Sequence, residues 1–265
     1  MSTSPPTPRW PNVLSRERRK EARYDRQKRS ARTGRRAGDR RTRGGASRRA
    51  RGPVRRARDV AILLFEDVEV LDFAGPFEVF SVTGQRDGSA PFRVFTTAEA
   101  VRPIRARNGL SVNPHCSLEA CLPPDILVVP GGFGTRREMN NPVLLDWIRR
   151  IAPRAEVVLS VCTGSVVLGR AGLLDGLQAT THHGALDLLA EAAPNTTIRR
   201  DLRFVDNGHI ITSAGISAGI DASLHVVARL LGVEQARETA THMEYDWRSE
   251  PVTAQSSTEP GARGE

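Results

Sequence analysis

Cys162 stands where an apolar strand pattern gives way directly to a helix pattern. Residues 156–161 are typical of a buried strand, and residues 164–171 form an apolar helix that Gly172 ends. A thiol on such a turn projects clear of the sheet, and we expect the helix N-terminus to stabilise the thiolate and lower the pKa of Cys162. A lone cysteine is more commonly a buried structural residue. Its position at the turn nevertheless favours a nucleophile.

Two glycines follow the predicted strand at 125–129, in the segment Pro130-Gly131-Gly132-Phe133-Gly134. The carboxyl ends of parallel strands meet at one edge of a sheet, where ligands bind. Glycine permits backbone angles that turn N–H groups into a cleft. We therefore expect the amides of Gly131 and Gly132 opposite Cys162, as donors to an anion or oxyanion. The same turn also occurs as a plain loop.

An acidic loop follows the predicted strand at 60–65. Asp72 lies between the apolar Leu71 and Phe73, just before an expected helix start. A carboxyl group beside a thiolate can take or return a proton, and its own pKa rises there. Asp72 could instead be only a helix cap. Glu66 and Asp67 fit a solvated face.

Two adjacent histidines, His182 and His183, precede an expected helix. His182 is a candidate for the pocket wall, although such pairs are more often part of a solvated loop. The His, Cys and Asp spacings resemble no metal site, and the glycines at 131, 132 and 134 lack the dinucleotide-binding spacing. We therefore expect no metal and no cofactor.

Strand and helix patterns alternate from residue 59 onward, which predicts an α/β protein with a parallel sheet covered on both faces. The expected strands are 60–65, 92–97, 125–129 and 156–161, with hairpins at 102–112 and 203–212. The expected helices are 76–80, with Pro76 at its start, and then 142–151, 164–171, 186–192, 220–231 and 233–243.

The charge is unevenly distributed along the 265 residues. Residues 1–58 hold 21 Lys/Arg and 4 Asp/Glu, whereas residues 59–265 hold 18 and 26. We expect residues 1–57 to be a disordered Arg-rich tail, residues 58–248 to be the folded domain, and residues 249–265 to be a disordered tail. The basic tail is either idle or contacts phosphate groups without specificity. The acidic folded part argues against a nucleic-acid binder.

The cysteine count indicates a reducing compartment. Three cysteines, with no paired spacing and no secretion signal, predict free thiols in the cytoplasm. No apolar stretch has the length of a membrane span, so no membrane partner is expected.

Five segments together resemble the DJ-1/PfpI superfamily over residues 58–248. They are similar in particular to its isonitrile hydratase branch and to the ligand domain of AraC-type regulators. The segments are Leu71-Asp72-Phe73-Ala74-Gly75-Pro76, Pro130-Gly131-Gly132-Phe133-Gly134, Ser160-Val161-Cys162-Thr163-Gly164-Ser165, Ala179-Thr180-Thr181-His182 and residues 212–221.

The resemblance implies a flavodoxin-like three-layer sandwich with a mostly parallel sheet, and usually a homodimer. It implies the addition of water to an isonitrile, giving an N-substituted formamide. The expected catalytic residues are Cys162 as nucleophile, Asp72 as the acid and Thr163 beside it. The expected residues around the small-molecule substrate are Gly131, Gly132, Phe133 and His182, with His183 and Ile216 also lining the pocket.

Three rival functions make different demands on the sequence. Peptidase-like relatives carry His directly after the cysteine, whereas Thr163 stands there in this chain, which argues against a protease. Only 17 residues follow Arg248, so we expect no DNA-reading module and no specific nucleic-acid binding. A glyoxalase-type or oxidation-sensing protein remains open, because Glu66 or Glu69 could supply the Glu that those relatives use.

Overall fold

A seven-stranded sheet organises residues 56–247, which are the residues that the computed structural model describes. The expected tails at 1–57 and 249–265 lie almost wholly outside this range. The strand order is β10-β11-β7-β6-β1-β2-β5, and every pair of neighbours is parallel except β10 with β11. The strands are β1 Arg58–Leu63, β2 Phe92–Ala98, β5 Cys116–Ser117, β6 Ile126–Val129, β7 Val157–Val161, β10 Phe204–Asp206 and β11 Ile210–Ser213.

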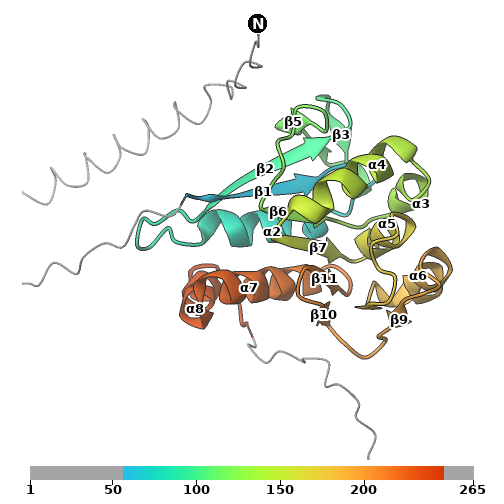
Figure 1. Cartoon of the computed structure of the whole chain (residues 1–265). Helices are drawn as coiled ribbons and strands as arrows, with labels where there is room; N and C mark the ends of the chain where they lie inside the picture. Colours follow the sequence, from blue (N-terminus) through green and yellow to red (C-terminus); the bar gives the residue numbers. More distant parts are fainter. Residues whose placement is uncertain (1–55, 248–265) are drawn as a thin grey trace, which may run out of the picture. The chain divides into compact units, whose positions relative to one another are not determined.

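Helices cover both faces of the sheet (Figure 1). One layer contains α2 Val70–Val82, α7 Ala218–Leu231 and α8 Val233–His242, which contact one another. The other contains α3 Thr135–Glu138, α4 Pro142–Ile151, α5 Gly164–Arg170 and α6 Leu186–Ala192. In this layer α3, α4 and α6 all pack against α5. The flavodoxin-like three-layer sandwich with a mostly parallel sheet is therefore confirmed.

The central strands carry the core. All residues of β6 and β7 are buried, as expected for apolar strands that are covered on both faces. Helix α4 turns its apolar side inward, and the side chain of Asn141 caps it by accepting the amides of Val143 and Leu144 at 3.1 and 3.4 Å.

Both predicted hairpins are present. Strands β3 Ile104–Arg105 and β4 Ser111–Val112 pair antiparallel around the short helix η1 Arg107–Gly109, where Asn108 and Gly109 have φ of 61° and 90°. Strands β10 and β11 form the second hairpin. The remaining short elements are η2 Ala152–Arg154, β8 Gln178–Ala179, η3 His183–Ala185 and β9 Thr197–Ile198.

The predicted start of the first helix is wrong. It begins at Val70, six residues before Pro76, and Pro76 lies inside it. The proline lacks the N–H that would bond to the carbonyl of Asp72, four residues earlier. Phe73 before Pro76 and Val79 and Phe80 after it are buried, so packing against the core outweighs this loss. As a result Asp72 lies in the first turn of α2 rather than before it.

Candidate active site

Cys162 occupies the sharp turn between β7 and α5. Its φ is 55°, a left-handed conformation that is uncommon for any residue with a side chain. The Cys162 amide donates to the carbonyls of Ser213 and Ala214 at 3.2 Å each, and its carbonyl accepts the Thr181 hydroxyl at 2.9 Å. These bonds hold the turn in its strained form, as is typical of functional sites.

Small residues make this turn possible. A Cβ on Gly164 would overlap the carbonyl oxygen of Val129 on the neighbouring strand β6. A Cβ on Gly219, in α7, would lie 2.6 Å from a methyl group of Val161. The start of α5 and the start of α7 therefore approach the sheet as closely as backbone allows, and Cys162 lies between them.

Asp72 faces Cys162 from the first turn of α2. Its side chain is fully buried, and its Oδ2 accepts the Gly131 amide at 3.1 Å. No N–H or O–H donor within residues 56–247 bonds its Oδ1. The thiol of Cys162 and the amide of Ile216 both interact with this carboxyl group. The buried Oδ1 therefore has a lone pair that a proton can occupy.

Thr163 ties the cysteine turn to the loop after β6. The Gly132 amide donates to Thr163 Oγ1 at 3.0 Å, and the Thr163 hydroxyl lies 3.1 Å from the Gly132 carbonyl. The hydroxyl of Thr135 lies 3.0 Å from Thr163 Oγ1. A Cβ on Gly131 would lie 2.5 Å from the Thr163 amide nitrogen and 2.9 Å from Asp72 Oδ2, so only glycine fits there.

The expected role of the two glycine amides changes with this geometry. Each of them lies beside the cysteine turn, but each already donates to a side chain of the site. In this arrangement Gly131 and Gly132 position Asp72 and Thr163 rather than offering an open oxyanion site.

Two other amides face the sulfur. The N–H groups of Thr163 and Ile216 interact with Cys162 Sγ in the sense that favours the thiolate. Ile216 has φ of 54°, which is a genuine outlier for a β-branched residue. The sequence predicts Ile216 only as a residue that lines the pocket. Its flanking Gly215 and Ser217-Ala218-Gly219 were the available signal of an unusual backbone.

The expected lowering of the Cys162 pKa is wrong. Burial, and then the negative charge of Asp72, raise the pKa of the thiol to about 12. Helix α5 has only seven residues, and the donation by the Thr163 amide is the smaller effect. Burial also raises the pKa of Asp72 to about 7. The resting site therefore holds a protonated thiol beside a carboxyl group that titrates near neutral pH.

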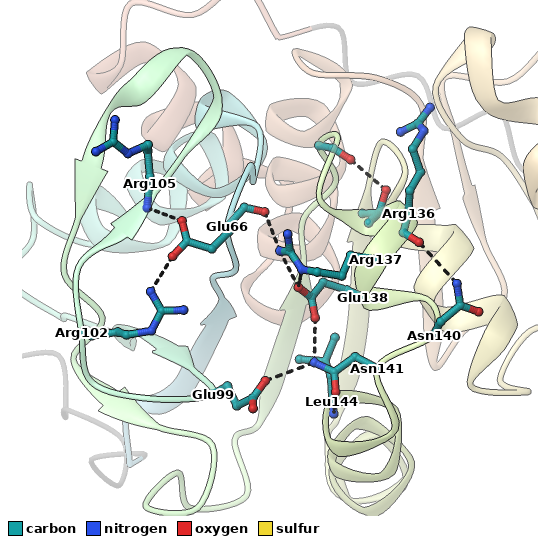
Figure 2. A network of polar contacts seen from close by, with 12 residues as sticks. Glu66, Glu99, Arg102, Arg105, Arg136, Arg137, Glu138, Asn140, Asn141 and Leu144 are labelled. Atoms are coloured by element: carbon teal, nitrogen blue, oxygen red, sulfur yellow. Dashed lines mark hydrogen bonds and ion pairs between the residues drawn. The ribbon is translucent and has the colours of Figure 1, made fainter.

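The other acids of the first loop lie elsewhere. Glu66 binds the guanidinium of Arg102 at 2.5 Å and the Arg105 amide at 2.9 Å (Figure 2), and Arg102 lowers the pKa of Glu66. It lines a cavity of about 260 Å³ together with Arg137 and with Leu144 of α4. Glu69 precedes α2, and its charge contributes to the raised pKa of Asp72. Asp72 is the acid that the structure brings to the thiol.

His182 lies on the loop that follows β8. It is half-buried, its Nδ1 accepts the Gly184 amide at 3.1 Å, and its ring lies 4.1 Å from that of His183. A Cβ on Gly215 would overlap the His182 ring, so the histidine packs directly on the backbone that precedes Ile216. Burial, followed by the nearby charges of His183 and Arg136, lowers the pKa of His182.

Phe133 projects outward from the loop after β6, with 57% of the residue exposed. No three His, Cys, Asp or Glu side chains of the described residues gather as a metal site. No helix within the same residues is long and apolar enough to cross a bilayer.

The DJ-1/PfpI family model matches residues 58–229, and the chain belongs to this family. An isonitrile hydratase from Pseudomonas putida is 38% identical over 190 residues, covering 71% of this chain and 79% of its own length. The transcriptional regulator CdhR of Pseudomonas aeruginosa is 34% identical over 180 residues, and the match spans 53% of the regulator and 68% of this chain.

Solved structures show the same fold. A ThiJ/PfpI family protein from Pseudomonas syringae superposes with a TM-score of 0.66 at 28% identity, covering 82% of this chain and 86% of the other. Drosophila melanogaster DJ-1beta superposes with a TM-score of 0.63 at 20% identity, covering 72% of this chain and all of the other.

Proposed function

We propose that this chain is a cysteine-dependent hydratase that adds water to small isonitriles. The observation that carries the proposal is the pairing of Cys162 with the buried carboxyl group of Asp72, whose Oδ1 no N–H or O–H donor of the described residues bonds. Similarity to the Pseudomonas putida hydratase supports the choice of substrate. A homodimer in the cytoplasm is part of the same proposal, carried over from the family resemblance, and light scattering measures the dimer.

The first step forms a thioimidate. The thiol proton passes to Asp72 as the sulfur attacks the terminal carbon of R–N≡C, and the proton then moves to that carbon, giving R–N=CH–S–Cys162. A carboxyl group with a pKa near 7 suits both transfers at neutral pH. The amides of Thr163 and Ile216 stabilise the sulfur while it carries negative charge.

The second step uses water. Asp72 takes a proton from a water molecule that attacks the thioimidate carbon, and the nitrogen gains a proton. The C–S bond of the resulting R–NH–CH(OH)–S–Cys162 then breaks. The sulfur recovers its proton, and the formamide R–NH–CHO leaves. Atoms and charge balance over the cycle, and the carboxyl group returns to its starting state.

Replacing the nucleophile tests the proposal. Cys162→Ala is expected to abolish hydration of a neutral isonitrile such as cyclohexyl isonitrile, measured by formation of the formamide. The matched variant Cys116→Ala removes a thiol in β5, away from the cysteine turn, and keeps activity. Full activity of Cys162→Ala would exclude the covalent mechanism. Circular dichroism checks that the variant is folded.

A ligand-sensing domain is the second candidate, and the match to the regulator CdhR favours it. A sensor binds its ligand without turnover, so binding of an isonitrile with no formamide product would decide for it. The oxidation-sensing function fits less well, because sensor thiols have low pKa values and the Cys162 pKa is raised.

A further inference from the structure

The ring of Phe133 contacts the guanidinium groups of two arginines that lie in different elements. The guanidinium carbon of Arg136, in α3, lies 4.9 Å from the centre of the Phe133 ring. That of Arg107, in the hairpin between β3 and β4, lies 5.4 Å from it. A guanidinium that stacks on a ring uses its face for this contact, and its N–H edges stay free for other partners. We call these three residues the arginine rim.

The two guanidiniums have no carboxylate partner among residues 56–247. Two nearby arginines do have carboxylate partners: Arg102 pairs with Glu66, and Arg137 pairs with Glu138. Figure 2 shows the side chain of Arg136 directed away from this paired network. Two guanidiniums without a carboxylate partner can bind an anion through their N–H groups. The exposed ring beside them can contact the apolar part of the same molecule.

Backbone contacts place the arginine rim beside Cys162. The Arg107 amide donates to the Val68 carbonyl at 2.8 Å, and Val68 bridges to Gly132, whose amide bonds Thr163. Phe133 follows Gly132 directly. The segments that carry Phe133 and Arg107 are therefore joined by hydrogen bonds to Thr163, the residue that follows Cys162.

The arginine rim also has an electrostatic neighbour in His182. Arg136 acts electrostatically on His182, which packs on Gly215 next to Ile216. The carboxylate that acts on the same histidine is Glu69. The surroundings of the site thus hold charges of both signs, with Glu69 as an acid and the guanidiniums of Arg107 and Arg136 as cations beside Phe133.

We propose that the arginine rim binds the carboxylate of the substrate, so that the preferred isonitriles carry an acidic group. Arg107 and Arg136 present their edges to the carboxylate, and Phe133 supports the carbon chain that joins it to the reacting group. This inference rests on the proposed hydratase function for the substrate, but the anion preference itself is a property of the site and can be measured without turnover.

Alkylation of Cys162 tests the anion preference directly. Iodoacetate and iodoacetamide have nearly the same size and differ in charge. Their rates at the Cys162 peptide are measured by mass spectrometry in the full chain, as a ratio relative to free cysteine. We expect the iodoacetate-to-iodoacetamide ratio to exceed that of free cysteine, to fall severalfold in Arg107→Ala/Arg136→Ala, and to fall with added salt. Arg150→Ala, an exposed arginine of α4, is the control and leaves the ratio unchanged.

Turnover provides the second measurement. Isocyanoacetate is expected to have a higher kcat/KM than methyl isocyanoacetate, and the double variant is expected to lose this preference. The control Arg150→Ala keeps the preference and hydrates cyclohexyl isonitrile as the parent protein does. An unchanged alkylation ratio in the double variant, or no preference for the acid, overturns the arginine rim. Absence of hydration of every isonitrile overturns the proposed function instead, and the alkylation ratio still decides the rim.

Discussion

The thiol of Cys162 and the carboxyl group of Asp72 form a buried pair that shares the protons of the site. Burial raises both pKa values, to about 12 and about 7, and the amides of Thr163 and Ile216 offset part of this effect at the sulfur. A resting thiolate would be exposed to oxidation. A thiol that loses its proton only when the substrate arrives avoids this damage, and the carboxyl group beside it supplies the base.

The rate should therefore depend on the ionisation of Asp72. Because its carboxylate accepts the thiol proton, kcat/KM is expected to rise with pH through an apparent pKa of about 7. Asp72→Asn should remove this rise and lower kcat at least a hundredfold, within the usual range for a general base. The control Glu69→Gln keeps the rise but moves it to lower pH, because the Glu69 charge helps to raise the Asp72 pKa. An unchanged pH profile in Asp72→Asn would rule out its role as base.

The raised pKa of Asp72 predicts that ionisation of this group lowers the free energy of unfolding. The pKa of Asp72 is raised from 3.8 to about 7 on folding, so the folded state binds more protons between these values. Stability from this group is present below the unfolded pKa and is lost as the pH rises towards 7, by up to about 4 kcal/mol. Asp72→Asn should therefore raise the melting temperature more at pH 8 than at pH 5. Equal effects at both pH values would contradict a buried, charged Asp72.

The strands were largely predictable, because apolar runs that are buried on both faces leave a clear pattern in the sequence. The glycine turn after β6 and the cysteine turn after β7 followed from the topology of parallel strands. The start of α2 was missed because Pro76 is typical of a first helical turn, and only tertiary packing explains its place inside a helix. The pKa of Cys162 and the backbone of Ile216 depend on burial by distant segments, so no local pattern predicts them.

The close approach of α5 to the sheet gives a prediction at the level of elements. Gly164→Ala would place a methyl group on the carbonyl oxygen of Val129, so the start of α5 must shift and carry Cys162 with it. We expect a loss of roughly 1–3 kcal/mol in unfolding free energy, as for overpacked cores, together with a loss of kcat. Denaturant unfolding and steady-state kinetics measure the two effects.

Gly184→Ala is the matched control for this substitution. The added Cβ would lie 3.4 Å from the nearest ring atom of His182, which is an ordinary contact. Stability and kcat should both stay close to those of the parent protein. A Gly164→Ala protein that behaves like this control would show that the cysteine turn tolerates movement of α5.

The parallel strands β1, β6 and β7 all begin at one end of the sheet and finish at the opposite end. Strand β1 runs parallel to β6, and β6 runs parallel to β7, so Arg58 begins β1 at the edge opposite to Cys162. Arg58 binds Glu156 at 2.6 Å with 19% of its side chain exposed, whereas Arg56 binds Asp125 with 70% exposed. The first pair fixes the start of β1, and the second is a surface contact that contributes about 0–1 kcal/mol.

Deleting residues 1–57 is therefore expected to leave kcat/KM and the melting temperature unchanged, since the site and its supporting contacts lie within the residues that remain. Adding Arg58→Ala to the shortened chain removes the less exposed ion pair and should lower the melting temperature by about 2–4 °C, the shift that 1 kcal/mol causes in a domain of this size. It should not change kcat/KM, because Arg58 lies at the far edge of the sheet. Thermal unfolding and kinetics of both proteins distinguish the cases. A large loss after the deletion alone would assign the first 57 residues a structural role, because the loss of the Arg56 contact cannot account for it.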